Sequence, residues 1–237
     1  MSAEPWRLVL ATYNVHGWVD RRGRRDAARA LAVIAELEAD VVALQEVYDP
    51  GLDPVDTRRL ELFASLEGHE CLLGPTLRAR GERYGNALLT RFPVLALDRH
   101  ALAVEGREPR GLIEARLDTP GTPLRILCTH LGLSRRERWR QVGWIAERVE
   151  HLDGPLALLG DFNTPLQRAP LVPITDRLGH APLARSWPAR FPLLPLDRIW
   201  IHPPSLLIRL RAHQSPAARR ASDHLPVVAE IAWPPAA

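Results

Sequence analysis

Short apolar or alternating runs recur along the chain, separated by polar turns and by segments with helical periodicity. Alternation with a period of two indicates a half-buried strand, and a short continuous apolar run indicates a strand buried on both faces. Many of these runs lie too close together to be joined by helices, so we expect mixed, largely antiparallel sheets. The predicted strands are 7–11, 41–44, 87–89, 113–117, 124–128, 156–159, 198–201 and 226–231.

Two segments, 25–38 and 134–150, have the spacing of helices that pack one face on a sheet. Ser134 is predicted to be the N-cap of the second helix, with Glu137 completing a capping box. Helices among closely spaced strands indicate a layered α/β fold. Proline-rich stretches are predicted to be ordered loops, and the absence of a repeat or long linker predicts one domain over 1–237. These loops are 50–54, 165–173 and 182–204.

Composition excludes several classes of protein. The 237 residues are 46% hydrophobic and 25% charged, as in ordinary globular proteins and unlike disordered or fibrous ones. No apolar run approaches the roughly 20 residues of a membrane-spanning helix, and the first ten residues do not resemble an export signal. Two cysteines, Cys71 and Cys128, form no metal-binding pair and suit a reducing compartment. We therefore expect a cytoplasmic protein without a transmembrane segment.

The positive charge of the chain is carried entirely by arginine, because the sequence contains no lysine. The net charge is only +3, although the pI is about 9.4. Arginine gathers at 21–25, 135–140 and 219–220, where planar guanidinium groups would suit phosphate oxygens. Neighbouring acidic residues dilute the field, so a solvated surface and a phosphate contact both stay open for each cluster.

Polar side chains follow several of the apolar runs. Acidic, amide and imidazole residues in such positions are presented at the end of a strand, where a rigid scaffold holds them. Oxygen ligands of this kind favour Mg²⁺ or Mn²⁺ over zinc, which prefers sets of cysteine and histidine. Each residue alone is also explained as a cap or turn residue, and a single Asn14 or His130 is more often structural, so both interpretations stay open for single positions. The residues are Asn14, Glu46, His130, Asp161 and Asn163.

Six short motifs occur in a fixed order between residues 12 and 227. They are Thr12-Tyr13-Asn14, Leu44-Gln45-Glu46-Val47, Thr129-His130-Leu131, Gly160-Asp161-Phe162-Asn163, Leu196-Asp197-Arg198-Ile199 and Ser222-Asp223-His224-Leu225-Pro226-Val227. In this order they resemble the endonuclease/exonuclease/phosphatase superfamily, which includes deoxyribonuclease I and neutral sphingomyelinases. Segments 85–89 and 107–111 resemble a group of small bacterial members described as metal-dependent hydrolases. The resemblance implies a four-layered α/β sandwich, with two mixed, mostly antiparallel β-sheets packed face to face and flanked by helices.

The resemblance also implies which residues hold a metal and activate water. Glu46 would be the principal carboxylate ligand, supported by Asn14 and Asp223, in a water-rich site for Mg²⁺ with Mn²⁺ as a substitute. Asp161 would orient or deprotonate the attacking water. Taken alone, Asp223 could equally cap a turn.

The remaining motif residues are implied to bind the phosphate. Asn163 and protonated His224 would donate hydrogen bonds to phosphate oxygens, and Asp197 would accept the other ring N–H of His224. Three roles stay open for His224, which could act as a base, as an acid or as an electrostatic clamp. His130 and Arg110 would also contact the phosphate, with Arg107 as the second candidate for the basic side chain.

These expectations describe a Mg²⁺-dependent phosphoester hydrolase that acts by in-line attack of water on a phosphodiester. Nucleic acid and a phospholipid headgroup are the two substrate classes. The acidic, proline-bearing stretch 47–57 disfavours tight DNA binding, and the apolar stretch 182–196 could accommodate a lipid. A phosphomonoesterase acting on a small metabolite and an inactive binding module are the alternatives. We expect a monomer without an obligate protein partner.

Overall fold

The computed structural model describes residues 6–20, 22–49, 55–79, 82–165 and 169–233. The helical elements, with η for 3₁₀ turns, are η1 (His16–Trp18), α1 (Ala27–Glu36), α2 (Val55–Leu66), α3 (Arg135–Arg148), α4 (Val172–Leu178), η2 (Pro204–Leu206) and α5 (Ala218–Ala221). The strands are β1 (Trp6–Asn14), β2 (Val41–Asp49), β3 (Glu70–Ala79), β4 (Glu82–Thr90), β5 (Val94–Ala101), β6 (Gly111–Leu117), β7 (Leu124–His130), β8 (Leu156–Asp161), β9 (Asp197–His202), β10 (Leu207–Ala212) and β11 (Val227–Trp233).

Within the described residues the strands form two mixed sheets. The first has six strands in the order β10-β11-β1-β2-β4-β3, and the second has five in the order β5-β6-β7-β8-β9. Each sheet contains one parallel pair, β1 with β2 and β7 with β8, while the other pairs are antiparallel. A parallel pair needs a crossover, and the two predicted helices α1 and α3 supply it in the two sheets. The two parallel pairs end at motif residues, with Asn14 opposite Gln45 in the first sheet and His130 opposite Asp161 in the second.

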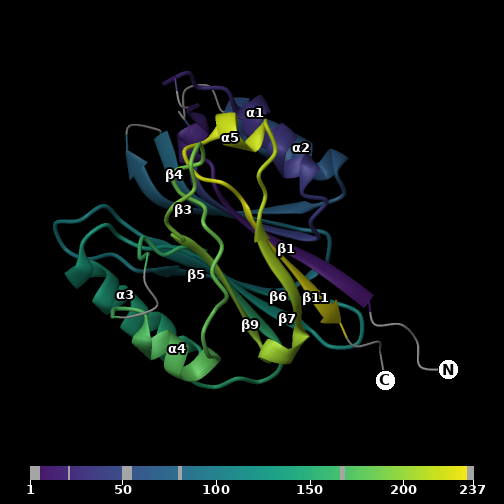
Figure 1. The fold of residues 1–237 in the computed structure, drawn as a ribbon, viewed down its shortest axis with the longest axis vertical. Coiled ribbons are helices and arrows are strands. Elements are labelled where there is room, and N and C mark those ends of the chain that lie inside the picture. The colour runs from purple at the N-terminus through teal and green to yellow at the C-terminus, as the bar shows by residue number, and fades with distance from the viewer. Residues whose placement is uncertain (1–5, 21, 50–54, 80–81, 166–168, 234–237) are drawn as a thin grey trace.

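The sheets and helices stack in four layers (Figure 1). One apolar cluster fills the space between the sheets and includes Leu10, Leu88, Ile126 and Leu159. A second lies between the six-stranded sheet and helices α1, α2 and α5, and a third between the five-stranded sheet and helices α3 and α4. The predicted α/β sandwich of two mixed, mostly antiparallel sheets flanked by helices is confirmed. No helix in the described part of the chain is long and apolar enough to cross a membrane.

Seven of the eight predicted strands lie inside observed strands, and the eighth, 226–231, begins one residue before β11. Both predicted helices form. Ser134 caps α3 by accepting a hydrogen bond from the Glu137 N–H at 3.2 Å, as predicted. The Glu137 carboxylate accepts from Gln141 Nε2 at 3.3 Å.

The sequence pattern missed β3, β5 and β10, and the helices α2, α4 and α5. Stretch 165–173 was predicted to be a loop, yet α4 begins at Val172 within it, because Pro173 in the first helical turn needs no N–H partner. Loop 50–54 lies outside the described residues.

Candidate active site

Strand register brings three predicted site residues side by side on the five-stranded sheet. His130 at the end of β7 pairs with Asp161 at the end of β8, and Asp161 pairs with Asp197 at the start of β9. All three are at most 4% exposed. A buried polar group needs a partner, so these side chains must be satisfied by each other or by a ligand.

An irregularity in β2 delivers Glu46 to the same place. The register of β2 against β4 shifts between Leu44 and Val47, and Glu46 adopts a positive φ of 58°. A bulge of this kind re-aims a side chain that regular pleating would point elsewhere. Non-glycine residues with positive φ cluster at functional sites, and Asn163, with φ of 47°, is another at this site.

Gly160 allows β8 to approach β7 closely just before Asp161. A Cβ built on Gly160 would lie 2.0 Å from the Thr129 carbonyl oxygen, so no other residue fits without moving the strands. The glycine of the Gly160-Asp161-Phe162-Asn163 motif is thus explained by packing. Beyond it, the Asn163 backbone N–H donates to Asp161 Oδ1 at 2.8 Å and fixes that carboxylate.

Asn14, at the end of β1, joins the two sheets. Its Nδ2 donates to Glu46 Oε1 at 2.8 Å and to Asp161 Oδ2 at 3.1 Å. Its Oδ1 accepts from the His16 backbone N–H at 2.9 Å, which leaves one lone pair of the amide oxygen for a cation. Asn14 therefore holds two carboxylates together, and its predicted role as a metal ligand stays a prediction.

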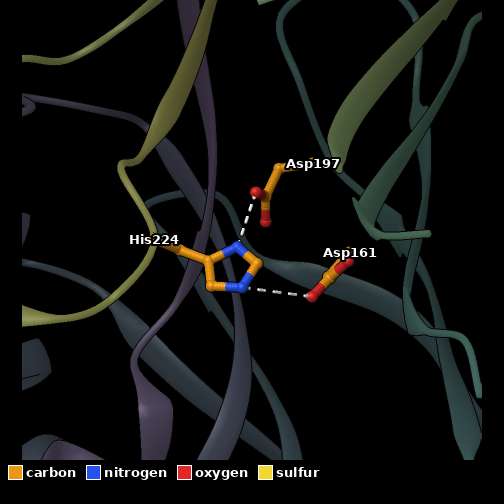
Figure 2. Close-up of side chains that lie close together, drawn as sticks. All are labelled: Asp161, Asp197 and His224. Carbon is orange, nitrogen blue, oxygen red and sulfur yellow. Dashed lines mark hydrogen bonds and ion pairs between the residues drawn. The ribbon is translucent and has the colours of Figure 1, made fainter. Parts of the chain in front are cut away.

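His224 lies between two buried carboxylates (Figure 2). Its Nδ1 is 2.8 Å from Asp197 Oδ2, and its Nε2 is 3.7 Å from Asp161 Oδ2. Burial would lower the pKa of His224, but the charges of Asp197 and Asp161 outweigh burial and raise the pKa to about 10. The imidazole is therefore charged at neutral pH, as the predicted dyad with Asp197 requires.

The segment that carries His224 is fastened to β1 through Ser222. The Ser222 hydroxyl donates to the Asn14 carbonyl at 2.8 Å and accepts from the His224 N–H at 3.2 Å. The serine of the Ser222-Asp223-His224 motif thus positions the two residues after it.

His130 faces the same carboxylate but is neutral. Its Nε2 is 3.6 Å from Asp161 Oδ2, and its Nδ1 is 3.4 Å from Arg110 Nη1. Burial lowers the pKa of His130 to about 3, and the positive charges of Arg110 and His224 add to this effect against the attraction of Asp161. Asn163 Nδ2 lies 3.1 Å from Nε2 and donates to the Leu131 carbonyl at 2.8 Å.

The structure separates the two candidate arginines. Arg110 is 6% exposed, donates to Glu108 at 2.9 Å and has a buried Nε without a partner among the described residues. Arg107 is exposed and lines a separate groove with Ser134, Arg136 and Arg140. Two arginines of the 135–140 cluster therefore face this groove. A buried, incompletely paired guanidinium beside His130 fits the predicted phosphate contact better than Arg107 does.

Asp223, the third predicted metal ligand, has two neighbours that the sequence did not single out for this place. His16 Nδ1 is 3.3 Å from Asp223 Oδ1, and Trp187 Nε1 donates to Asp223 Oδ2 at 3.3 Å. The spacing Asn-x-His after the first strand is the sequence signal that could have pointed to His16.

The donor chemistry of the site suits a divalent cation. Asp161, Asp197 and His224 are buried and offer ligand atoms within 4.8 Å of one another, so this cluster could hold a metal ion. Asp197 Oδ1 is buried without a hydrogen-bond partner among the described residues. Glu46 and Asp223 add carboxylates at the more exposed side of the cluster. Carboxylate and amide oxygens in this number are what Mg²⁺ and Mn²⁺ bind.

A groove of about 400 Å³ lies at the opposite ends of β7 and β8, away from these residues. Its Glu114 is already paired with Arg125 and Arg148 at 2.6 and 2.7 Å. The candidate catalytic and metal-binding side chains therefore lie at the Asp161 end of these strands and not beside this groove.

Comparison with known proteins agrees with this geometry. The model of the Endonuclease/Exonuclease/phosphatase family matches residues 11–224, which span every site residue named above. The chain belongs to this family. This match confirms the predicted family resemblance. Members of the family are hydrolases that act on phosphoester bonds, and the family generally uses divalent metals.

Relatives extend over nearly the whole chain. The uncharacterized protein YbhP of Escherichia coli (strain K12) is 32% identical, over 97% of this chain and 98% of YbhP. An endonuclease/exonuclease/phosphatase structure from Beutenbergia cavernae DSM 12333 is 24% identical with a TM-score of 0.77, covering 97% of this chain and 72% of that one. Truncated Caenorhabditis elegans TDP2 is 17% identical with a TM-score of 0.69, covering 96% and 98%. The two structures support the fold.

Proposed function

We propose that this family member is a phosphodiesterase that uses a divalent cation, Mg²⁺ or Mn²⁺, to activate water against a phosphodiester. The observation that carries the proposal is the buried imidazole of His224, with Nδ1 at 2.8 Å from Asp197 and Nε2 at 3.7 Å from Asp161, whose charges raise its pKa to about 10. A charged donor in a buried site is what the extra negative charge of a phosphoryl transition state requires.

Glu46, Asp223 and Asn14 would hold the cation. When bound, it supplies positive charge that offsets the charge on phosphate oxygens and acidifies water. We place it on the Glu46 side rather than within the Asp161, Asp197 and His224 cluster, because the protonated ring of His224 has no lone pair to offer a metal and already offsets one of the two carboxylate charges there.

Asp161 is proposed to orient the attacking water and accept its proton. Both of its oxygens are fixed, Oδ1 by the Asn163 N–H at 2.8 Å and Oδ2 by Asn14 Nδ2 at 3.1 Å. A carboxylate whose position is fixed in this way costs little reorganisation when a water is aligned for in-line attack.

His224 is proposed to donate its Nε2–H to a phosphate oxygen. The 3.7 Å from Nε2 to Asp161 Oδ2 is longer than a hydrogen bond, so this proton is available to a ligand. The Asp197 carboxylate at 2.8 Å keeps Nδ1 protonated. The amide of Asn163, the ring of His130 and the guanidinium of Arg110 would bind the other phosphate oxygens.

Among phosphodiesters, the surface beside Asp223 favours an amphiphilic one such as a phospholipid headgroup over nucleic acid. The loop that contains Trp187 is tied to Asp223 by the Ala189 N–H, which donates to its carbonyl at 2.7 Å. That loop exposes Leu183, Phe191 and Leu193 by 54%, 64% and 63%. Large exposed apolar side chains next to a polar site are typical of contact with lipid or with another apolar surface. A cytoplasmic address, consistent with the free cysteines, is part of the proposal.

The test is an assay of purified protein with Mg²⁺, Mn²⁺ or EDTA on bis-p-nitrophenyl phosphate, plasmid DNA, abasic duplex, RNA and phospholipid vesicles. We expect metal-dependent hydrolysis of the diester and of vesicle phospholipid. Glu46→Ala should lower kcat/KM by about 10²-fold or more, and exposed Glu67→Ala should not. Activity that EDTA leaves unchanged would exclude the metal.

Further outcomes separate the alternatives. Hydrolysis of DNA or RNA in preference to vesicles would assign the nucleic-acid substrate. p-Nitrophenyl phosphate is assayed in parallel as a monoester, and activity confined to it would assign a phosphomonoesterase. A folded wild type that is inactive on every substrate would support the binding module.

A further inference from the structure

His16 is a histidine of the site to which none of the roles above has been assigned. It opens the 3₁₀ turn η1 directly after β1, with a positive φ of 50°. Its Nδ1 lies 3.3 Å from Asp223 Oδ1 and 3.8 Å from Glu46 Oε2. Those two carboxylates come from the loop before β11 and from the bulge in β2, so the ring bridges two separate segments.

The backbone around His16 is anchored on both sides. Before it, the Val15 N–H donates to the Gln45 carbonyl at 3.0 Å, and the His16 N–H itself donates to Asn14 Oδ1 at 2.9 Å. After it, the buried Trp18 donates its Nε1–H to the Tyr48 carbonyl at 2.8 Å. These bonds hold η1 against β2, so the position of the imidazole is determined by the fold.

The contacts of His16 differ from those of a histidine built into an ion pair. His224 has a carboxylate at 2.8 Å and a side chain only 7% exposed, whereas His16 is 43% exposed and both of its carboxylate contacts are longer. The ring nitrogen of His16 faces two carboxylate oxygens without a tight bond to either, so its lone pair can turn to a cation that both carboxylates attract.

We propose that His16 Nδ1 is a nitrogen ligand of the divalent cation held by Glu46 and Asp223, and that it shifts the preference of the site from Mg²⁺ towards Mn²⁺. The proposal rests on the metal site of the proposed function. Mg²⁺ takes oxygen ligands almost exclusively, while imidazole nitrogen suits the later first-row ions, whose affinity for such sites exceeds that of Mg²⁺.

The test uses the full chain, stripped with EDTA and titrated separately with MnCl₂ and MgCl₂ in a calorimeter. His16→Asn is the informative variant, because asparagine tolerates positive φ and so removes the ring nitrogen without straining η1. His151→Ala, at an exposed position at the opposite end of the strands, is the matched control. Circular dichroism and thermal melting verify that each variant is folded.

We expect the wild type to bind Mn²⁺ at least tenfold more tightly than Mg²⁺. His16→Asn should weaken Mn²⁺ binding by about 10- to 100-fold and change Mg²⁺ binding by less than about threefold, since loss of one ligating group has effects of this order. Electron spin echo envelope modulation detects a ¹⁴N nucleus coordinated to Mn²⁺. This signal should be present in the wild type and in His151→Ala, and lost in His16→Asn.

Two results would overturn the inference and leave the proposed function intact. The first is ¹⁴N modulation that persists in His16→Asn. The second is an unchanged Mn²⁺ affinity of His16→Asn while Glu46→Ala abolishes Mn²⁺ binding. If neither ion binds the wild type, or if Glu46→Ala binds Mn²⁺ normally, the metal site of the proposed function is itself wrong.

Discussion

His224 and His130 are two buried imidazoles on either side of one carboxylate. Their Nε2 atoms are 3.7 Å and 3.6 Å from the same oxygen, Asp161 Oδ2. Burial lowers the pKa of each, yet the pKa of His224 is raised to about 10 and that of His130 falls to about 3. The difference lies at Nδ1, which faces the Asp197 carboxylate at 2.8 Å in one ring and the Arg110 guanidinium at 3.4 Å in the other.

The pair shows how one site keeps a charged and a neutral imidazole close together. Two imidazolium rings beside Asp161 would repel each other, and the charge of His224 is itself one of the reasons that His130 stays neutral. The second partner of each ring therefore assigns its role. His224 becomes a cationic donor, and His130 becomes a neutral group that donates or accepts according to its tautomer.

The largest effect on this comparison should come from removing the charged ring. We expect His224→Ala to lower kcat/KM on bis-p-nitrophenyl phosphate by about 10²- to 10⁴-fold, the range seen when a positioned acid–base group or charged donor is lost. Steady-state kinetics at saturating metal would measure it, with exposed His151→Ala as the control. Retention of activity within about threefold would contradict the role assigned to His224.

The next effect should come from removing the charge that holds His224 protonated. Asp197→Asn leaves a side chain of the same shape, but burial then lowers the pKa of His224 from about 10 with less opposition. Activity at pH 8 should fall about 10²-fold, and the alkaline limb of kcat/KM should move to lower pH by more than one unit. Profiles of kcat/KM against pH would measure the loss of activity and the position of the alkaline limb, and NMR titration of the labelled imidazole would follow the pKa of His224. An alkaline limb that does not move would refute the pairing of His224 with Asp197.

A smaller effect should follow from changing the partner of His130. Arg110→Met removes the guanidinium at 3.4 Å, so the pKa of His130 should rise from about 3. We expect kcat/KM to fall about tenfold, the cost of one charge-assisted hydrogen bond to phosphate. Arg107→Met, three residues away and exposed, is the control and should change kcat/KM less than twofold. A larger loss in Arg107→Met than in Arg110→Met would reverse the assignment.

The sequence predicted the central strands because their surroundings are uniform. The run 156–159 is apolar throughout, and β8 is buried along its whole length. Edge strands were missed for the opposite reason. Along β5 only every third residue is partly buried, so a period of two is absent, and Asp98 and Arg99 interrupt the apolar pattern. Tertiary pairing with β6, which the local sequence does not encode, makes this segment a strand.

The sequence predicted those residues of the candidate site that lie within recognisable motifs. Residues on adjacent strands, such as His130 and Asp161, follow from the ends of apolar runs, and the register confirms that they are neighbours. The choice between Arg107 and Arg110 depends on burial, which two residues so close in sequence do not reveal. The position of His16 depends on η1 and on Asp223, 207 residues further along the chain. Such contacts are set by packing and were found only in the fold.

The smallest effect should appear in stability against pH, measured without metal. The pKa of His224 in the folded chain, about 10, lies above the 6.5 of the unfolded chain, so its contribution is complete below pH 6.5 and is lost as pH rises towards 10. The folded pKa of His130, about 3, lies below 6.5, so its neutral ring contributes above pH 6.5 and stability is lost as pH falls towards 3. The two slopes therefore have opposite signs.

Melting temperatures in EDTA from pH 4 to 10 would separate these slopes. Relative to the wild type, His224→Gln should flatten the alkaline decline and His130→Gln the acid decline, each by a few degrees in Tm. Carboxylates with lowered pKa, such as Glu114, add to the acid decline in every variant, so the comparison is the difference from wild type at each pH. Equal curves for the two variants would mean that the opposite partners, Asp197 and Arg110, do not set opposite charges on the two rings.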